Sequence, residues 1–311
     1  MRILVTGGAG FIGTNLIRRL LKNSWEVICI DNFDDYYSSI VKRNNLSEFT
    51  TCNRFKSIEG DIRDKELLAK IKGVDSIIHL AAKPGVRTSF EYADVYESTN
   101  VGGTKVLLDF AISNSIKKIV FASSSSVYGS NPDLPWSEKT VPMPIAPYAD
   151  TKLAAENIGK IYSDLYALQF ISLRFFSIYG PHQRPDLAIT KFFNAVSSSM
   201  PVTLYGDGES TRDFTFVEDA VSAIIKALSY SDSIFEIFNI GSGRNISLLN
   251  ILQKIGNICD SKPKIVNMPF QLGDAQHTLS NIDKARGMLD YRVTVDIDTG
   301  LREFYSWYLR G

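Results

Sequence analysis

The N-terminal region contains Gly7-Gly-Ala-Gly10-Phe-Ile-Gly13, directly after the short apolar run Ile3–Thr6. Apolar residues at helical spacing follow from Leu16 onward, so the glycines mark a turn from a strand into a helix. Glycine permits a tight turn at position 7, close approach of a pyrophosphate at position 10, and close helix–strand packing at position 13. Because a helix N-terminus also attracts phosphates, the pattern predicts a dinucleotide site. Its G-x-x-G-x-x-G spacing differs from G-x-G-x-x-G, so we expect the turn to differ in detail.

Acidic residues follow two of the next apolar runs. Asp31 ends the run Val27–Ile30, and Asp61 comes shortly after Phe55–Ile58. A carboxylate at the end of the second strand accepts hydrogen bonds from an adenosine ribose and repels a 2′-phosphate, which favours NAD over NADP. Asp61 is expected to reach the adenine amine, with an ordinary strand-end turn as the alternative.

Short apolar runs alternate with helical stretches through the first half of the chain. Repeated β–α units predict an α/β fold with a Rossmann-type, doubly wound parallel sheet. After about Phe176 the rhythm loosens, which predicts a second, smaller mixed α/β lobe that binds substrate. We expect residues 1–176, with roughly 214–240, to form the NAD-binding domain, and residues 177–213 with 241–311 to form the substrate lobe. Further expected elements are the strands Ser76–Leu80, Ile119–Ala122 and Ile171–Phe175 and the helices Val101–Ile112 and Tyr148–Tyr166.

The composition argues against several classes of partner. The 311 residues carry 34 Lys and Arg against 34 Asp and Glu, so charge gives no reason to expect nucleic acid or an anionic membrane. No apolar run reaches the length of a membrane span and no signal peptide is visible, so we expect a cytoplasmic protein. No metal is expected, because the candidate ligands are scattered; they are Cys29, Cys52, Cys259, His79, His182 and His277.

Tyr148 and Lys152 predict a proton-transfer group at the start of a helix. Pro147 suits an early helical position, and residues four apart share one helix face. An ammonium beside a phenol lowers the pKa of the phenol, which makes it usable as an acid or base near neutral pH. Ser123–Ser126 follow the strand Lys118–Ala122 and offer hydroxyls at the carboxyl end of the sheet. The alternatives are an ordinary amphipathic helix for Tyr148 and Lys152 and a polar turn for the serines. Because both segments follow a dinucleotide-binding pattern, we favour a catalytic role.

Together these motifs resemble the extended short-chain dehydrogenase/reductase family, and within it the NAD-dependent nucleotide-sugar epimerases. The resemblance covers essentially the whole chain and is greatest to the UDP-glucuronate 4-epimerases. It implies C4 epimerisation of a UDP-sugar through a transient 4-keto intermediate, with UDP-glucuronate to UDP-galacturonate as the leading reaction. The segments that carry it are Asp31-Asn-Phe-Asp-Asp-Tyr-Tyr37, Ala81-Ala-Lys-Pro-Gly-Val-Arg87, Ser123-Ser-Ser-Ser-Val-Tyr-Gly129, Arg174-Phe-Phe-Ser-Ile-Tyr-Gly-Pro181, Arg184-Pro-Asp186 and Arg212-Asp-Phe-Thr215.

The resemblance implies that Tyr148 removes the proton of the sugar 4-hydroxyl while C4 gives a hydride to NAD⁺. Lys152 would lower the phenol pKa and bind the nicotinamide ribose. Ser124, with Ser126 beside it, would hydrogen-bond the reacting oxygen. The keto sugar would then turn over and take the hydride back on its other face, so NAD should be held tightly. The implied cofactor-binding residues are Gly7, Gly10, Phe11, Ile12, Gly13, Asp31, Asn32, Asp61, Ile62, Leu80, Ala81, Ala82, Thr99, Ser123, Tyr148 and Lys152.

The same resemblance implies a set of substrate contacts. Arg212 would contact the diphosphate, and Asp274 would hold the uridine ribose. Arg184 and Ser177 would grip a sugar carboxylate, whereas Arg87 would reach the same region or anchor a loop. The full implied set is Arg87, Ser124, Ser126, Ser177, Arg184, Thr203, Tyr205, Arg212 and Asp274, in which residues 203–205 line the uracil and ribose pocket.

Three positions depart from the family pattern. Ser177 is commonly threonine in the glucuronate branch, Lys83 stands where glutamine is expected, and Gln271 stands where many relatives carry arginine, which would remove one diphosphate contact. Epimerisation of UDP-glucose or UDP-N-acetylglucosamine is therefore the alternative. A 4,6-dehydratase is disfavoured because Ser125 and Ser126 stand where those enzymes carry Asp-Glu. A non-catalytic NAD sensor is disfavoured by the retained Tyr-x-x-x-Lys pair, and the family implies a homodimer through the helices at 101–112 and 148–166.

Overall fold

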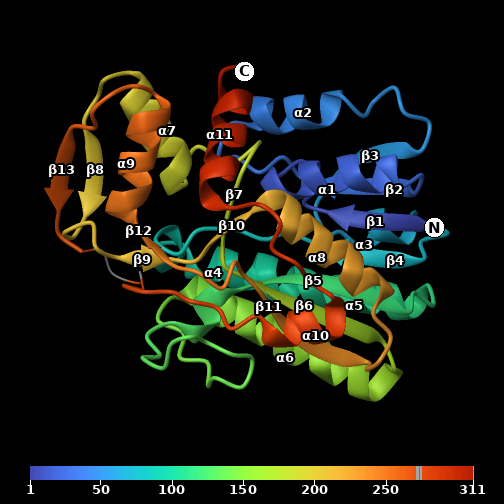
Figure 1. Ribbon diagram of the computed structural model, residues 1–311. Helices are drawn as coiled ribbons and strands as arrows, with labels where there is room; N and C mark the ends of the chain where they lie inside the picture. The colour runs from blue at the N-terminus through green and yellow to red at the C-terminus, as the bar shows by residue number, and fades with distance from the viewer. Residues whose placement is uncertain (271–272, 274, 311) are drawn as a thin grey trace.

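The computed structural model describes residues 1–270, 273 and 275–310. Its centre is a seven-stranded sheet with the strand order β11-β6-β5-β4-β1-β2-β3, in which neighbouring strands are parallel (Figure 1). The predicted doubly wound sheet is thus confirmed. The order reverses at β1 and β4, and open α/β sheets bind ligands beside such a reversal. The strands are β1 (Arg2–Thr6), β2 (Glu26–Asp31), β3 (Phe55–Glu59), β4 (Ser76–His79), β5 (Lys118–Ser124), β6 (Gln169–Phe175) and β11 (Phe235–Ile240).

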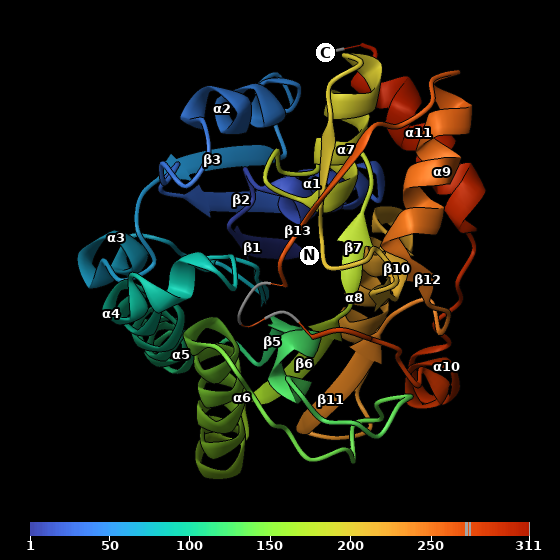
Figure 2. The same cartoon turned by 90° about the vertical axis from the view of Figure 1, so that its left-hand side faces the viewer.

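Both faces of the sheet are buried. Successive side chains of a strand point to opposite faces, and each face packs into its own apolar cluster. In β1, Ile3 and Val5 join one apolar cluster and Leu4 joins the other. The helices therefore cover the sheet from both sides (Figure 2). Helices α1 (Phe11–Lys22), α2 (Ser39–Ser47), α8 (Val217–Ser229) and α10 (Asp283–Leu289) contribute to the first cluster, and α3 (Lys65–Ala69), α5 (Gly103–Ser113) and α6 (Pro147–Tyr166) contribute to the second.

The observed elements differ from the predicted ones mainly at their ends. β5 continues two residues beyond its predicted end, so Ser124 is the last residue of this strand, at the carboxyl end of the sheet. The helix predicted from Val101 extends a π-helical segment, Glu97–Gly102, which itself follows α4 (Ala93–Tyr96). Short 3₁₀ turns lie at Thr88–Phe90 and Ser125–Tyr128. These turns carry the chain from the sheet edge into the loops that border the site.

A smaller group of elements lies beside the carboxyl ends of the strands and has its own apolar cluster (Figure 1). Phe193, Leu204, Ile251 and Phe304 are buried in it, and their side chains come from three helices and a strand. The predicted division of the chain into two domains stays a prediction. The remaining elements are β7 (Ser177–Tyr179), α7 (Ala188–Ser197), β8 (Val202–Tyr205), β9 (Thr211–Arg212), β10 (Phe214–Phe216), β12 (Ile246–Ser247), α9 (Leu248–Ile258), β13 (Ile265–Met268) and α11 (Ile297–Tyr308).

None of the described helices is long and apolar enough to cross a membrane. Among residues 1–270, 273 and 275–310, no three His, Cys, Asp or Glu side chains come together in a way that could hold a metal ion.

Candidate active site

A cavity of about 1080 Å³ opens at the carboxyl ends of the parallel strands. Its walls come from the β1–α1 turn, the ends of β2, β4 and β5, the start of α6, and β8 of the smaller lobe. All residues predicted to bind the cofactor line this cavity. So do the predicted substrate residues Arg87, Ser124, Ser177, Arg184, Thr203, Tyr205 and Arg212.

The glycine turn forms the cofactor end of the cavity. Gly7 has φ +70°, and a Cβ there would lie 2.7 Å from the backbone nitrogen of Ala81. A Cβ on Gly13 would lie 2.5 Å from the Gly7 carbonyl oxygen, so α1 packs directly on the turn. Helix α1 has no side-chain cap and no acidic residue in its first turn, which leaves its N-terminus open to an anion.

Two carboxylates flank this turn. Asp31 ends β2, and its oxygens accept hydrogen bonds from the backbone N–H groups of Ala9 (3.0 Å) and Phe33 (2.9 Å). Burial raises the pKa of Asp31 and these hydrogen bonds oppose the rise. Asp61 is held by Arg63 through two hydrogen bonds of 2.8 Å, which lower the pKa of Asp61 and keep it ionised. The predicted ribose and adenine contacts of the two carboxylates stay predictions.

Tyr148 and Lys152 lie in the first turns of α6, which begins at Pro147 as expected. Lys152 Nζ donates to the Ala122 carbonyl oxygen at 2.7 Å, and burial lowers the pKa of Lys152 to about 7 against the opposing charge of Glu156. Burial raises the pKa of Tyr148.

The charge of Arg184 and a hydrogen bond with Ser124 oppose this rise in the pKa of Tyr148. In the described part of the chain, no hydrogen bond joins Lys152 to Tyr148, since the ammonium bonds the Ala122 carbonyl oxygen at the end of β5. The predicted effect of Lys152 on the phenol pKa stays a prediction.

The serine turn arranges Ser124 through its own neighbours. Ser124 Oγ donates to Ser126 Oγ at 3.0 Å and accepts from the backbone N–H of Ser126 at 3.1 Å. Ser126 is not among the residues that line the cavity; it lies in the 3₁₀ turn that follows Ser124. Ser126 thus positions Ser124 through these hydrogen bonds, and its predicted contact with substrate stays a prediction. His79 on β4 is buried between Thr6 (2.8 Å) and Thr104 (3.0 Å), and burial lowers its pKa to about 3.

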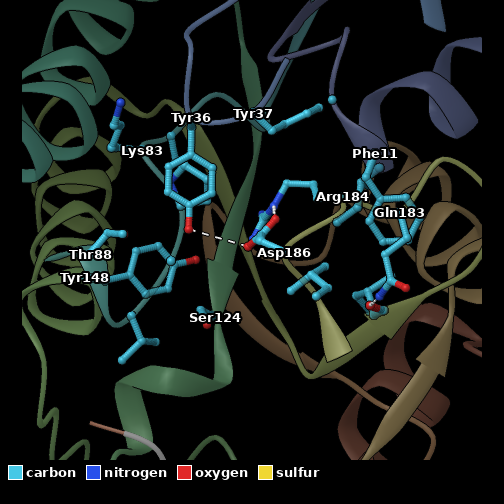
Figure 3. A pocket seen from close by; sticks show the side chains of 18 of the residues that line it. Phe11, Tyr36, Tyr37, Lys83, Thr88, Ser124, Tyr148, Gln183, Arg184 and Asp186 are labelled. Atoms are coloured by element: carbon cyan, nitrogen blue, oxygen red, sulfur yellow. Dashed lines mark hydrogen bonds and ion pairs between the residues drawn. The ribbon is translucent and has the colours of Figure 1, made fainter. Parts of the chain in front are cut away.

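Charged and aromatic side chains form the opposite end of the cavity (Figure 3). Arg184 makes two hydrogen bonds to Asp186, from Nε at 2.9 Å and from Nη2 at 3.0 Å. The Tyr36 hydroxyl donates to Asp186 Oδ2 over 3.5 Å, and Ser177 begins β7 nearby. Because these residues line the same cavity as Tyr148, this end of the cavity belongs to the same site as the proton-transfer group.

A model of NAD dependent epimerases and dehydratases matches residues 3–241. The chain belongs to the NAD dependent epimerase/dehydratase family. It is 35% identical to the UDP-glucuronate 4-epimerase of Thermodesulfobacterium geofontis, over 98% of this chain and 95% of that protein. The crystal structure of UDP-glucuronic acid 4-epimerase from Bacillus cereus, in complex with UDP-glucuronic acid and NAD, is 34% identical with a TM-score of 0.94 and covers 100% and 99% of the two chains. The UDP-glucose 4-epimerase of Thermotoga maritima with UDP-glucose is 30% identical, with a TM-score of 0.93 over 100% and 99%.

The residues of this epimerase/dehydratase fit NAD. The uncapped start of α1 suits a pyrophosphate, and Asp31 lies at the cavity end of β2. Within the described residues, the hydroxyl oxygens of Ser123 and Tyr37 are buried without a hydrogen-bond partner, and both residues line the cavity. Such groups are costly unless a ligand pairs with them.

Sequence reasoning left out several lining residues of this epimerase/dehydratase. Tyr36, Tyr37 and Asp186 lie in segments that carry the family resemblance, but no role was assigned to them. Lys83 also lines the cavity and pairs with Asp34 at 2.8 Å, which joins the loops after β2 and β4. The signal available was their place in those segments. The contacts of Tyr36 with Asp186 and of Lys83 with Asp34 join residues far apart in the sequence, whereas the ion-pair partner of Asp186 is its near neighbour Arg184. The predictions for Gln271 and Asp274 lie outside the described residues.

Proposed function

We propose that this enzyme catalyses the NAD-dependent C4 epimerisation of a UDP-sugar through a transient 4-keto intermediate, and that it converts UDP-glucuronate to UDP-galacturonate. The observation that carries the substrate is the guanidinium of Arg184, which lines the same cavity as Tyr148 and Ser124. A guanidinium matches a sugar carboxylate in charge and shape. The similarity to UDP-glucuronate 4-epimerases along the whole chain supports the same choice.

Each residue has a separate task in this proposal. The hydride chemistry at sugar C4 would be supplied by NAD, which the glycine turn and Asp31 would hold. Tyr148 takes the proton of the 4-hydroxyl and gives it back, while Ser124 hydrogen-bonds the same oxygen. Lys152 would hold the nicotinamide ribose, and Arg184 with Ser177 would hold the sugar carboxylate. Lys152 is buried and Tyr148 is half-buried in the cavity wall, which limits the access of water to the reacting groups.

UDP-glucose is a second candidate substrate. Arg184 is already neutralised by Asp186, so a sugar without a carboxylate does not leave an unpaired cation in the cavity. The high structural similarity to a UDP-glucose 4-epimerase supports this candidate as well.

A panel of UDP-sugars tests the proposal. Purified protein with NAD is incubated separately with UDP-glucuronate, UDP-glucose and UDP-N-acetylglucosamine, and the products are separated by chromatography. We expect the highest kcat/KM with UDP-glucuronate. Faster turnover of UDP-glucose would reverse the choice of substrate, and no epimerisation of any UDP-sugar by protein that holds NAD would favour the NAD sensor.

We further propose that the protein is a homodimer that pairs through α5 and α6. Tyr162 on α6 donates a hydrogen bond to Asp109 on α5, so the two helices present one joined face. Ile161, Leu165 and Tyr166 are exposed on it. Light scattering should show a dimer that Leu165→Glu dissociates and that Ile40→Glu leaves intact, because both side chains are 68% exposed but Ile40 lies on α2. A monomeric wild type would contradict this proposal.

We also propose that the protein is cytoplasmic. Cell fractionation tests this compartment.

A further inference from the structure

Three side chains from two distant parts of the chain, Tyr36 on one and Arg184 with Asp186 on the other, meet beside Tyr148 (Figure 3). Arg184 and Asp186 form a bidentate ion pair, and the Arg184 guanidinium lies 5.6 Å from the centre of the Tyr36 ring. Tyr36 in turn donates its hydroxyl toward Asp186 at 3.5 Å. All three line the same cavity as the proton-transfer group.

The pairing uses only part of the Arg184 fork. Asp186 occupies Nε and Nη2, and among the described residues nothing is bonded to Nη1. The Arg184 side chain is 20% exposed and that of Asp186 is 32% exposed, so the two charges interact in a partly desolvated place. A second carboxylate that binds Nη1 would share one cation with Asp186. A neutral group at the same point would find the cation already compensated.

Tyr36 is held in place from behind. Gly85 has φ +95°, and a Cβ on it would collide with Tyr36 Oη, so the ring packs against the loop after β4. The Tyr36 backbone N–H donates to Asp34 Oδ1 at 2.9 Å, and Asp34 pairs with Lys83 of that loop. These contacts fix the position of the Tyr36 ring. Its hydroxyl therefore limits where the Asp186 carboxylate can move.

We propose that Asp186 is a positioning residue that sets how strongly the site discriminates between a carboxylated and a neutral sugar nucleotide. It keeps Arg184 neutralised, which permits neutral sugars and weakens the attraction for a uronate. Without the Asp186 charge, only a uronate would compensate Arg184, and a neutral sugar would bury an unpaired cation. This inference rests on the proposed function, because it assigns the sugar end of the cavity to Arg184.

The test compares affinity and turnover for UDP-glucuronate and UDP-glucose in matched variants that hold NAD. For Asp186→Asn, we expect the ratio of affinities, uronate over neutral sugar, to rise about 10-fold. The change should be in KM, with kcat nearly unaltered, because the C6 contact is made equally in the ground and transition states. Asp186→Glu should return the ratio toward the wild-type value. Arg184→Met combined with Asp186→Asn should give a ratio below wild type, because the guanidinium donors are lost.

Asp35→Asn is the matched control, since it removes the same charge from an exposed position next to Tyr36 and should leave the ratio unchanged. Melting temperature and bound NAD are measured for each variant. A fall of both affinities by the same factor in Asp186→Asn would show that Asp186 only supports the loop, and would overturn the inference. Affinities are measured by titration calorimetry, which does not require turnover. A wild type that binds both nucleotides and epimerises neither would refute the proposed function. The ratio of the two affinities would still test the role of Asp186.

Discussion

The two ends of the cavity are built in different ways. The phosphate-binding part of the cofactor end comes from one continuous stretch, β1 to β2, in which glycine backbone and a helix N-terminus face the cavity. The sugar end comes from side chains, and Tyr36 meets a partner 150 positions later in the chain. Backbone recognition tolerates many side chains around it, whereas recognition by side chains depends on each pairing. The cofactor end is therefore the general part of the site, and the sugar end is the part that sets its substrate.

Hydrogen bonds between residues 181–182 and helices α1 and α2 connect the two ends of the cavity. Asn15 on α1 donates to the Pro181 carbonyl oxygen at 2.9 Å. Arg18 donates to His182 Nε2 at 3.0 Å, so His182 Nδ1 carries the proton and donates to Asn45 at 2.8 Å. The loop that carries Arg184 is thus attached to the helices of the cofactor end.

Replacing Tyr148 should have the largest effect, because both ends of the cavity converge on it. In Tyr148→Phe we expect kcat to fall about 1000-fold while bound NAD is retained. Tyr96→Phe is the control: the Tyr96 ring lies 6.3 Å from that of Tyr148, but its hydroxyl bonds Thr88 and the Pro84 carbonyl instead. If Tyr148→Phe kept a tenth of wild-type kcat, proton transfer would have to be assigned elsewhere.

A substitution in the glycine turn separates folding from cofactor binding. Gly13→Ala places a Cβ 2.5 Å from the Gly7 carbonyl oxygen, so we expect the free energy of unfolding to fall by about 3 kcal/mol. Gly10→Ala meets only the Gly7 oxygen, at 3.2 Å, and should lower NAD affinity more than stability. Denaturant unfolding and NAD titration measure the two quantities. Equal stability of both variants would contradict the assigned packing role of Gly13.

Arg184 tests whether the sugar end sets the substrate. Arg184→Met should lower kcat/KM for UDP-glucuronate by about 100-fold, because the carboxylate loses its charged partner. Turnover of UDP-glucose should change much less. Steady-state kinetics on both nucleotides measures the difference, and an equal loss on both would show that Arg184 acts on the whole site rather than on the carboxylate.

His182, which connects the two ends of the cavity, should make the free energy of unfolding depend on pH in the acid range. Burial and the Arg18 charge lower the pKa of His182 to about 4, from an ordinary value of 6.5. As the pH falls below 6.5, the unfolded chain takes up a proton that the folded protein does not, so stability declines until about pH 4. The wild type should lose roughly 1 kcal/mol more than His182→Gln between pH 6.5 and 5. Urea unfolding at both pH values measures this, and parallel declines would exclude His182.

The sequence predicted the parallel sheet, the glycine turn and the Tyr148–Lys152 pair because each is a local pattern. Strand, turn and helix alternate with their own periods, and residues four apart on a helix share a face whatever surrounds them. The contacts that Lys152 makes could not be read from this spacing. Its i+4 spacing allows an approach to Tyr148, but packing beside Ala122 and Phe121 directs the ammonium to the end of β5.

The identity of the cofactor end follows from the sequence alone, because its ligand is recognised by backbone that only a particular order of glycines permits. The contact of Tyr36 with Asp186, and the place of the Arg184–Asp186 pair in the same cavity as Tyr148, needed the tertiary structure. Arg184 and Asp186 are only two residues apart, but Tyr36 and Tyr148 come from other segments, and no local period relates them to this pair. Only folding brings their charges close enough, and dry enough, to act on one another.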